Sequence, residues 1–173
     1  SEIAFILENL PLGREEIKYR ISEILEKLKI KHLLDKDPHQ LSGGEKQKVA
    51  LASALVLNPK ILIMDVSLSM IDPTEREDIF KLLKKIHKKE KLTIVNITHD
   101  LEESYYGDKI VVINKGKVLI EGPTNGVLEK ERLLRKIGLE IPFMVDLSLK
   151  LKLYGLIDCL ILDMDEMVDV LWK

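Results

Sequence analysis

The sequence lacks most of the features that mark a membrane, secreted or metal-binding protein. Its 173 residues contain a single cysteine, Cys159, so no internal disulfide can form, and no cysteine and histidine spacing typical of a metal site occurs. No apolar run approaches the roughly 20 residues needed to cross a bilayer. The chain begins with Ser1-Glu2 instead of the basic segment that opens a signal peptide. These absences predict a cytoplasmic protein.

A strong charge of either sign is also missing. The 27 Lys and Arg residues nearly balance the 29 Asp and Glu residues, and the net charge of -2 predicts no strong attraction to nucleic acid or to an anionic membrane. We interpret the lysine-rich run at 84–91 as a solvated helix face. The hydrophobic content of 46% is typical of a soluble globular chain with one domain, or one domain and an appendage.

Hydrophobic periodicity predicts helices that alternate with strands in the first two thirds of the chain. The short apolar run at 61–64 shows no alternation, which predicts a parallel strand buried on both faces, and 92–98 is predicted as a second buried strand. A helix starting after Asp72-Pro73 connects them, so the order strand, helix, strand predicts an α/β fold with a parallel sheet. Amphipathic helices are predicted over 14–30 and 43–57.

The last third of the chain predicts a hairpin followed by helices. Asn114-Lys115-Gly116-Lys117 separates two apolar runs, which is a strong β-hairpin signal. A single helix is predicted from Thr124 to about Ile137, because Gly138 ends it. Beyond Pro142, two short amphipathic pieces near 145–154 and 163–172 predict a small helical appendage.

The segment Ser42-Gly43-Gly44-Glu45 combines a helix cap with two glycines. Serine followed three residues later by glutamate is a capping box, which explains these two residues without a ligand. It does not explain the glycines, each about 1 kcal/mol less favourable than alanine in a helix. A helix start with accessible amides is an anion site. We therefore favour phosphate binding over capping alone.

Three further polar residues follow or precede predicted elements. Asp65 ends the first apolar strand and His99 follows the second, so both should lie at the ligand-binding edge of the sheet. A carboxylate there can hold Mg²⁺ beside phosphates. The alternatives are a turn-forming aspartate and a locally hydrogen-bonded histidine. Asp72 either caps the next helix or belongs to the same site.

Together these segments resemble the ATP-binding cassette (ABC) ATPases. Leu41 to Gln47 (LSGGEKQ) resembles the signature motif of that family, and Ile61 to Asp65 (ILIMD) resembles its Walker B strand. Residues 69–72 resemble the D-loop, and 98–100 (THD) the switch-histidine segment. The tail from 133 to 172 resembles that of energy-coupling-factor ATPase subunits, which drive the uptake of vitamins and transition metals.

The resemblance implies a partial P-loop NTPase fold with three parts: a helical signature subdomain at 1–58, the remainder of the α/β core at 59–139 and a C-terminal dimerisation-like appendage at 140–173.

In the family, two ATPase subunits pair head to tail, and each nucleotide lies between the phosphate loop of one and the signature helix of the other. Ser42 and Gly44 would then contact the γ-phosphate held by the partner. Asp65 would serve Mg²⁺, and His99 the γ-phosphate, in the chain's own site. The resemblance assigns further residues to the nucleotide interface: Gly43, Glu45, Gln47 and Asp72.

The resemblance also implies partners and a location. The expected partners are a second ABC ATPase subunit, in a homodimer or heterodimer, an integral membrane coupling subunit and a substrate-binding membrane component, with no nucleic acid. ATP and Mg²⁺ are expected only at an interface shared with an intact ATPase partner. The chain would lie in the cytoplasm, peripheral to the cell membrane. The transported substrate stays open.

The sequence departs from the family pattern at two sites. No G-x-x-x-x-G-K-[ST] loop occurs in the 173 residues, so the cradle and lysine for the β- and γ-phosphates are missing. Val66 occupies the position of the glutamate that activates water, and valine cannot accept a proton. Without the phosphate-loop strand, exposed sheet edges and marginal stability are expected.

These departures leave three interpretations open, and with them the question whether the chain is an enzyme. In the first, the chain is the C-terminal portion of an energy-coupling-factor ATPase subunit and is incomplete as given. In the second, it is a non-catalytic partner that lends its signature helix in trans. In the third, it is a decayed product without activity.

Overall fold

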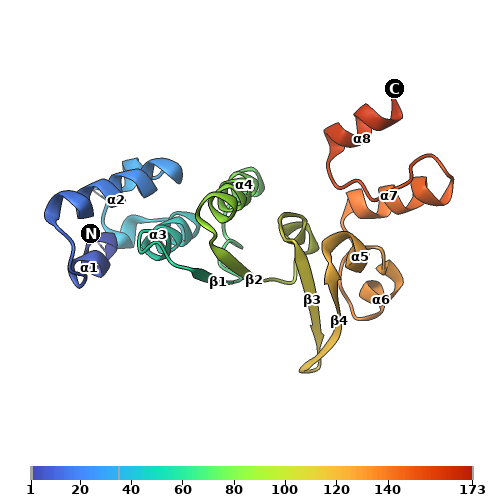
Figure 1. Cartoon of the computed structure of the whole chain (residues 1–173), viewed down its shortest axis with the longest axis horizontal. Helices are drawn as coiled ribbons and strands as arrows, with labels where there is room; N and C mark the ends of the chain where they lie inside the picture. Colours follow the sequence, from blue (N-terminus) through green and yellow to red (C-terminus); the bar gives the residue numbers. More distant parts are fainter. Residues whose placement is uncertain (1, 35, 173) are drawn as a thin grey trace. The chain divides into compact units, whose positions relative to one another are not determined.

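The computed structural model describes residues 2–34 and 36–172. The chain divides into two compact units, Ser1–Ile97 and Thr98–Lys173. Figure 1 shows the order of the helices and strands along the chain. The finer division at residues 58 and 139 remains a prediction.

The first unit begins with three helices, α1 (Glu2–Glu8), α2 (Arg14–Lys27) and α3 (Gly43–Leu55), and α1 contacts both of the others. The 3₁₀ turns η1 (Lys31–Leu33) and η2 (Pro38–Gln40) connect α2 to α3. The helix predicted over 14–30 ends three residues early, because Lys29 takes a left-handed conformation with φ of 57°. Apolar residues on the facing sides of these helices are buried, among them Ile24, Leu25, Leu51 and Leu55.

The predicted βαβ unit is confirmed. Strands β1 (Ile61–Asp65) and β2 (Thr93–Ile97) pair in parallel over their full length, with Asp65 opposite Ile97. Helix α4 (Pro73–Glu90) connects them and buries Ile79, Phe80, Leu83 and Ile86. Proline at the first helical position fits the start of α4, where its missing N–H costs nothing.

The predictions that β1 is buried on both faces and that β2 is a buried strand are wrong for one face of the sheet. In β1, Leu62 and Met64 are buried, whereas the side chains of Ile61 and Ile63 are 62% and 66% exposed. Val95 and Ile97 of β2 are exposed as well. One face of the two-stranded sheet therefore packs on the core, and among the described residues nothing buries the other. Because the exposed face also carries apolar residues, the strand sequences lack the apolar–polar alternation that normally indicates a solvent-facing side.

The second unit contains the predicted hairpin. After the 3₁₀ segment η3 (Leu101–Tyr106), strands β3 (Lys109–Asn114) and β4 (Lys117–Pro123) pair antiparallel. Lys115 and Gly116 form the turn, and both have positive φ, 50° and 74°. A two-residue turn with this geometry matches the twist of the paired strands, which is why the hairpin could be predicted.

The single helix predicted over 124–137 is wrong. The chain forms α5 (Thr124–Leu128) and α6 (Glu131–Lys136), separated at Lys130, whose ψ of 41° leaves the helical range. Leu128 and Leu134 lie on either side of the break and are both fully buried in the core of this unit. The break thus allows two short helices to reach one core, which the continuous apolar pattern concealed.

Two helices complete the second unit, α7 (Phe143–Leu153) and α8 (Met164–Leu171). The buried hydroxyl Oγ of Ser148 in α7 accepts a hydrogen bond of 2.8 Å from the backbone N–H of Ile161. This bond ties the connection between the helices to α7. Across residues 2–34 and 36–172, no helix has both the length and the apolar character needed to cross a membrane.

Candidate functional site

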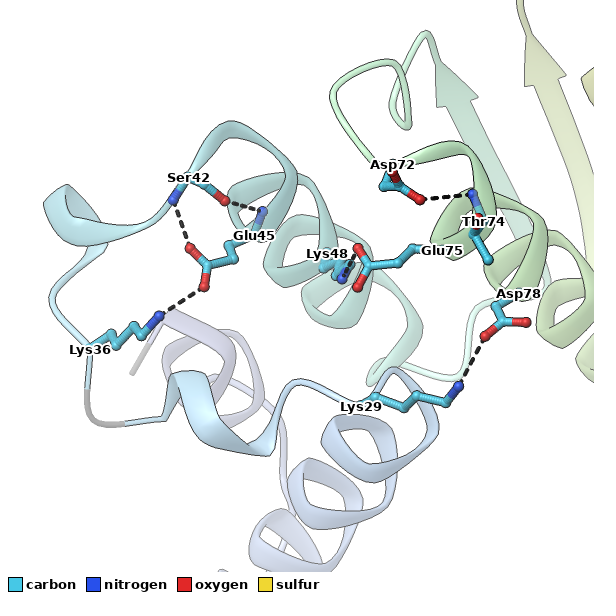
Figure 2. Close-up of polar contacts among 9 residues, drawn as sticks. All are labelled: Lys29, Lys36, Ser42, Glu45, Lys48, Asp72, Thr74, Glu75 and Asp78. Carbon is cyan, nitrogen blue, oxygen red and sulfur yellow. Dashed lines mark hydrogen bonds and ion pairs between the residues drawn. The ribbon is translucent and has the colours of Figure 1, made fainter.

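The capping box at the start of α3 forms as predicted. The backbone N–H of Glu45 donates to Ser42 Oγ at 3.2 Å, and the Ser42 N–H donates to Glu45 Oε2 at 2.8 Å (Figure 2). The second carboxylate oxygen of Glu45 accepts from Lys36 Nζ at 2.8 Å. The hydrogen bond from Lys36, followed by that from the Ser42 backbone, lowers the pKa of Glu45 to about 2. Glu45 is therefore ionised at neutral pH and committed to the cap.

The two glycines of α3 lie against a turn of the same chain. A Cβ added at Gly44 would come within 2.9 Å of the Met70 carbonyl oxygen, and one added at Gly43 within 2.6 Å of Met70 Sδ. The close approach that the glycines indicated is thus made by residues 69–71, which follow β1 in the sequence. The backbone contact explains Gly44 without a ligand, whereas Gly43 meets only the end of a flexible methionine side chain, which can move aside.

Polar side chains join α3 to the same turn and to α4. Gln47 Oε1 accepts from the Met70 N–H at 2.9 Å, and Gln47 Nε2 donates to Ser69 Oγ at 3.4 Å. Lys48, whose side chain is only 14% exposed, pairs with Glu75 of α4 at 2.6 Å (Figure 2). These contacts could not be predicted from the sequence, because the partners are 22 to 27 residues apart and share no local pattern.

The start of α3 nevertheless keeps the properties of an anion site. Within the described part of the chain, no acceptor takes the N–H groups of Gly43 and Gly44, the first two residues of the helix. Ser42 is exposed beside them. Unpaired amides at the positive end of a 13-residue helix favour an anion.

Asp65 is the last residue of β1, as predicted, and its side chain is exposed. Its carboxylate makes no hydrogen bond or ion pair with a described residue. Across the described residues, no three His, Cys, Asp or Glu side chains form a metal-ligand cluster. Proteins often hold Mg²⁺ through one or two carboxylates together with phosphates and water, and the role of Asp65 toward Mg²⁺ stays a prediction.

Val66 has a strained backbone that the sequence could not reveal. Its φ is 47°, in the left-handed region, where a β-branched side chain is a genuine outlier. Its N–H donates to the Ile97 carbonyl at 3.0 Å, which holds the residue in place. The position at which the resemblance predicts a water-activating glutamate thus holds an apolar, strained residue.

Asp72 and His99 lie in different units. The Asp72 carboxylate accepts from the Thr74 N–H at 2.9 Å, so the predicted cap of α4 is present (Figure 2). His99 belongs to the second unit, two residues beyond β2, and is exposed. The structure therefore brings together Ser42, the two glycines, Gln47 and the turn leading to Asp72, all within the first unit.

Comparisons with known proteins identify homologues of this chain among ABC ATP-binding proteins. Residues 2–68 match the ABC transporter family. The energy-coupling factor transporter ATP-binding protein EcfA1 of Clostridioides difficile is 40% identical over 169 residues, which is 97% of this chain and 61% of that protein. The chain is a homologue of the ABC ATPases. It spans about three fifths of the length of the curated relatives it matches.

Solved structures of ABC proteins share the fold. The structure of cbiO1 from Clostridium perfringens, described as part of the ABC transporter complex cbiONQ, is 35% identical, with a TM-score of 0.66 over 84% of this chain and 58% of its own. A dimeric ATP-binding cassette in a post-hydrolysis state bound to ADP and Pi is 32% identical, with a TM-score of 0.62 over 67% of this chain and 50% of its own. The chain therefore has the α/β fold of ABC ATPases in part, with a parallel βαβ unit.

Proposed function

We propose that this chain serves an energy-coupling-factor ABC importer as part of an ATPase subunit, and that it presents the start of α3 to ATP whose phosphates are held by a second subunit. The observation that carries the proposal is the capped start of α3, where the amides of Gly43 and Gly44 are unpaired beside exposed Ser42. The homology to energy-coupling-factor ATP-binding proteins supports the importer assignment. The dimeric relative bound to ADP and Pi supports a shared site.

In this proposal each residue of the first unit has a defined role. The capping box fixes Ser42 and holds the first turn of α3 open to an anion, and the helix dipole adds about half a positive charge at that end. Asp65 offers a free carboxylate to Mg²⁺. ATP and Mg²⁺, when bound, supply the phosphates and the counter-charge of the site. His99 would contact the γ-phosphate of a bound nucleotide.

In this proposal the chain does not hydrolyse ATP by itself. The 173 residues contain no phosphate loop, and Val66 cannot take a proton from water. We propose that an intact ATPase subunit supplies both functions, and that a membrane coupling subunit and a substrate-binding component complete the importer at the cytoplasmic face of the membrane. The same reasoning predicts no detectable ATP binding by the chain alone in calorimetry, and micromolar affinity would contradict it.

The experiment that tests the trans role must separate capping from phosphate contact. Ser42→Asp retains a good helix cap, since aspartate ranks with serine at this position, but places a negative charge beside the proposed γ-phosphate. We expect Ser42→Asp to reduce ATP turnover by a co-expressed intact subunit at least tenfold, with an unchanged unfolding midpoint. Ser22→Ala, an exposed serine of α2, is the control. Wild-type turnover with Ser42→Asp would refute the trans role and leave the decayed product as the better interpretation.

A further inference from the structure

One side chain holds the turn at 69–71 against α3. The Gln47 amide uses its oxygen to accept from the Met70 N–H at 2.9 Å and its nitrogen to donate to Ser69 Oγ at 3.4 Å. Glutamine is suited to this task because it carries an acceptor and a donor on one planar group. Both ends of the amide are therefore occupied by the chain itself, which gives Gln47 a different task from the nucleotide contact that the resemblance implied.

Two other contacts secure the same junction. The backbone of Gly44 lies so close to the Met70 carbonyl that no side chain fits between them. The Lys48–Glu75 ion pair joins the next residue of α3 to the first turn of α4. The ion pair and the glycine contact set the distance between the elements, while Gln47 accepts the N–H of Met70.

We propose that Gln47 is a positioning residue that locks the turn at 69–71 to the first two turns of α3, so that the signature segment and this turn move as one body. The turn connects the end of β1 to the Asp72-capped start of α4. A displacement of the start of α3 is then passed directly to both elements. The locking itself does not depend on the proposed function, whereas its effect on turnover does.

Hydrogen exchange at the Met70 amide in the 173-residue chain tests the locking. Gln47→Ala removes the acceptor, and we expect about fivefold faster exchange at Met70, the factor that follows from losing one typical hydrogen bond. Gln47→Glu keeps an acceptor at the same place, so the Met70 amide should exchange within twofold of wild type. Lys46→Ala, on the exposed neighbour, should change nothing. Unchanged Met70 exchange in Gln47→Ala would overturn the proposal, as would loss of protection in Gln47→Glu equal to that in Gln47→Ala.

Turnover with an intact ATPase subunit tests the consequence. A positioning role predicts that Gln47→Ala lowers kcat with little change in KM for ATP, and that Gln47→Glu restores most of it. A direct contact with the nucleotide predicts a raised KM in both variants, and this result would overturn the positioning role. If Ser42→Asp also leaves turnover unchanged, the proposed function fails, while the exchange experiment still decides whether Gln47 locks the turn.

Discussion

Backbone strain at Val66 predicts that glycine is a more stable replacement than alanine at this position. A side chain with a Cβ in the left-handed region costs about 1–2 kcal/mol, whereas glycine adopts it freely but is disfavoured elsewhere by about 0.5–1 kcal/mol of chain entropy relative to alanine. At Val66, with φ of 47°, the cost of the left-handed conformation exceeds the chain-entropy cost of glycine. Val66→Gly should therefore be more stable than Val66→Ala by roughly 0.5–1 kcal/mol, since both variants lose nearly the same apolar contact.

The matched pair lies in the neighbouring strand. Val95 in β2 is 43% exposed, close to the 40% of Val66, but it has ordinary strand geometry. There, Val95→Gly should be less stable than Val95→Ala by about 0.5–1 kcal/mol, because only the entropy difference operates. Urea denaturation of the four variants measures both differences. If alanine is the more stable replacement at both positions, Val66 is not strained and the reasoning fails.

Three further predictions concern other contacts. Gly44→Ala should destabilise the chain by about 1–3 kcal/mol through its clash with the Met70 carbonyl, whereas Gly126→Ala in α5, with open space around it, should not; thermal denaturation compares them. The lowered pKa of Glu45 means that the unfolded chain binds more protons than the folded chain between pH 4.5 and about 2. Wild-type stability should therefore fall over this range in acid titrations, and that of Glu45→Gln should fall less. Ser148→Ala leaves the N–H of Ile161 without its acceptor and should cost about 1–3 kcal/mol in denaturant unfolding, and a neutral result would contradict that bond.

The parts that could be predicted from sequence have local causes. The capping box depends on residues three positions apart, and the hairpin depends on two residues that must take positive φ. The βαβ unit follows from apolar runs of strand and helix length. Each of these signals is carried by neighbouring residues, so no knowledge of the fold was needed to find them.

The parts that failed depend on contacts between distant residues. The helix break at Lys130 is set by where Leu128 and Leu134 meet the core, which a continuous apolar pattern does not show. The Gly43-Gly44 pair indicated a close approach, and the turn at 69–71 lies there, while phosphate contact at this helix start stays a prediction. Glycines in a sequence can indicate that another group approaches the backbone closely, but they do not identify that group.

The contact between Gly44 and the Met70 carbonyl has a consequence for how such chains evolve. Because an alanine at this position would clash with the Met70 carbonyl, selection for stability alone would retain the glycine. A lineage that lost ATP hydrolysis could therefore drift at positions such as the one held by Val66 while its signature glycine stayed unchanged. An intact signature motif then indicates common ancestry and conserved packing. Activity must be judged from residues that have a catalytic role and no role in packing.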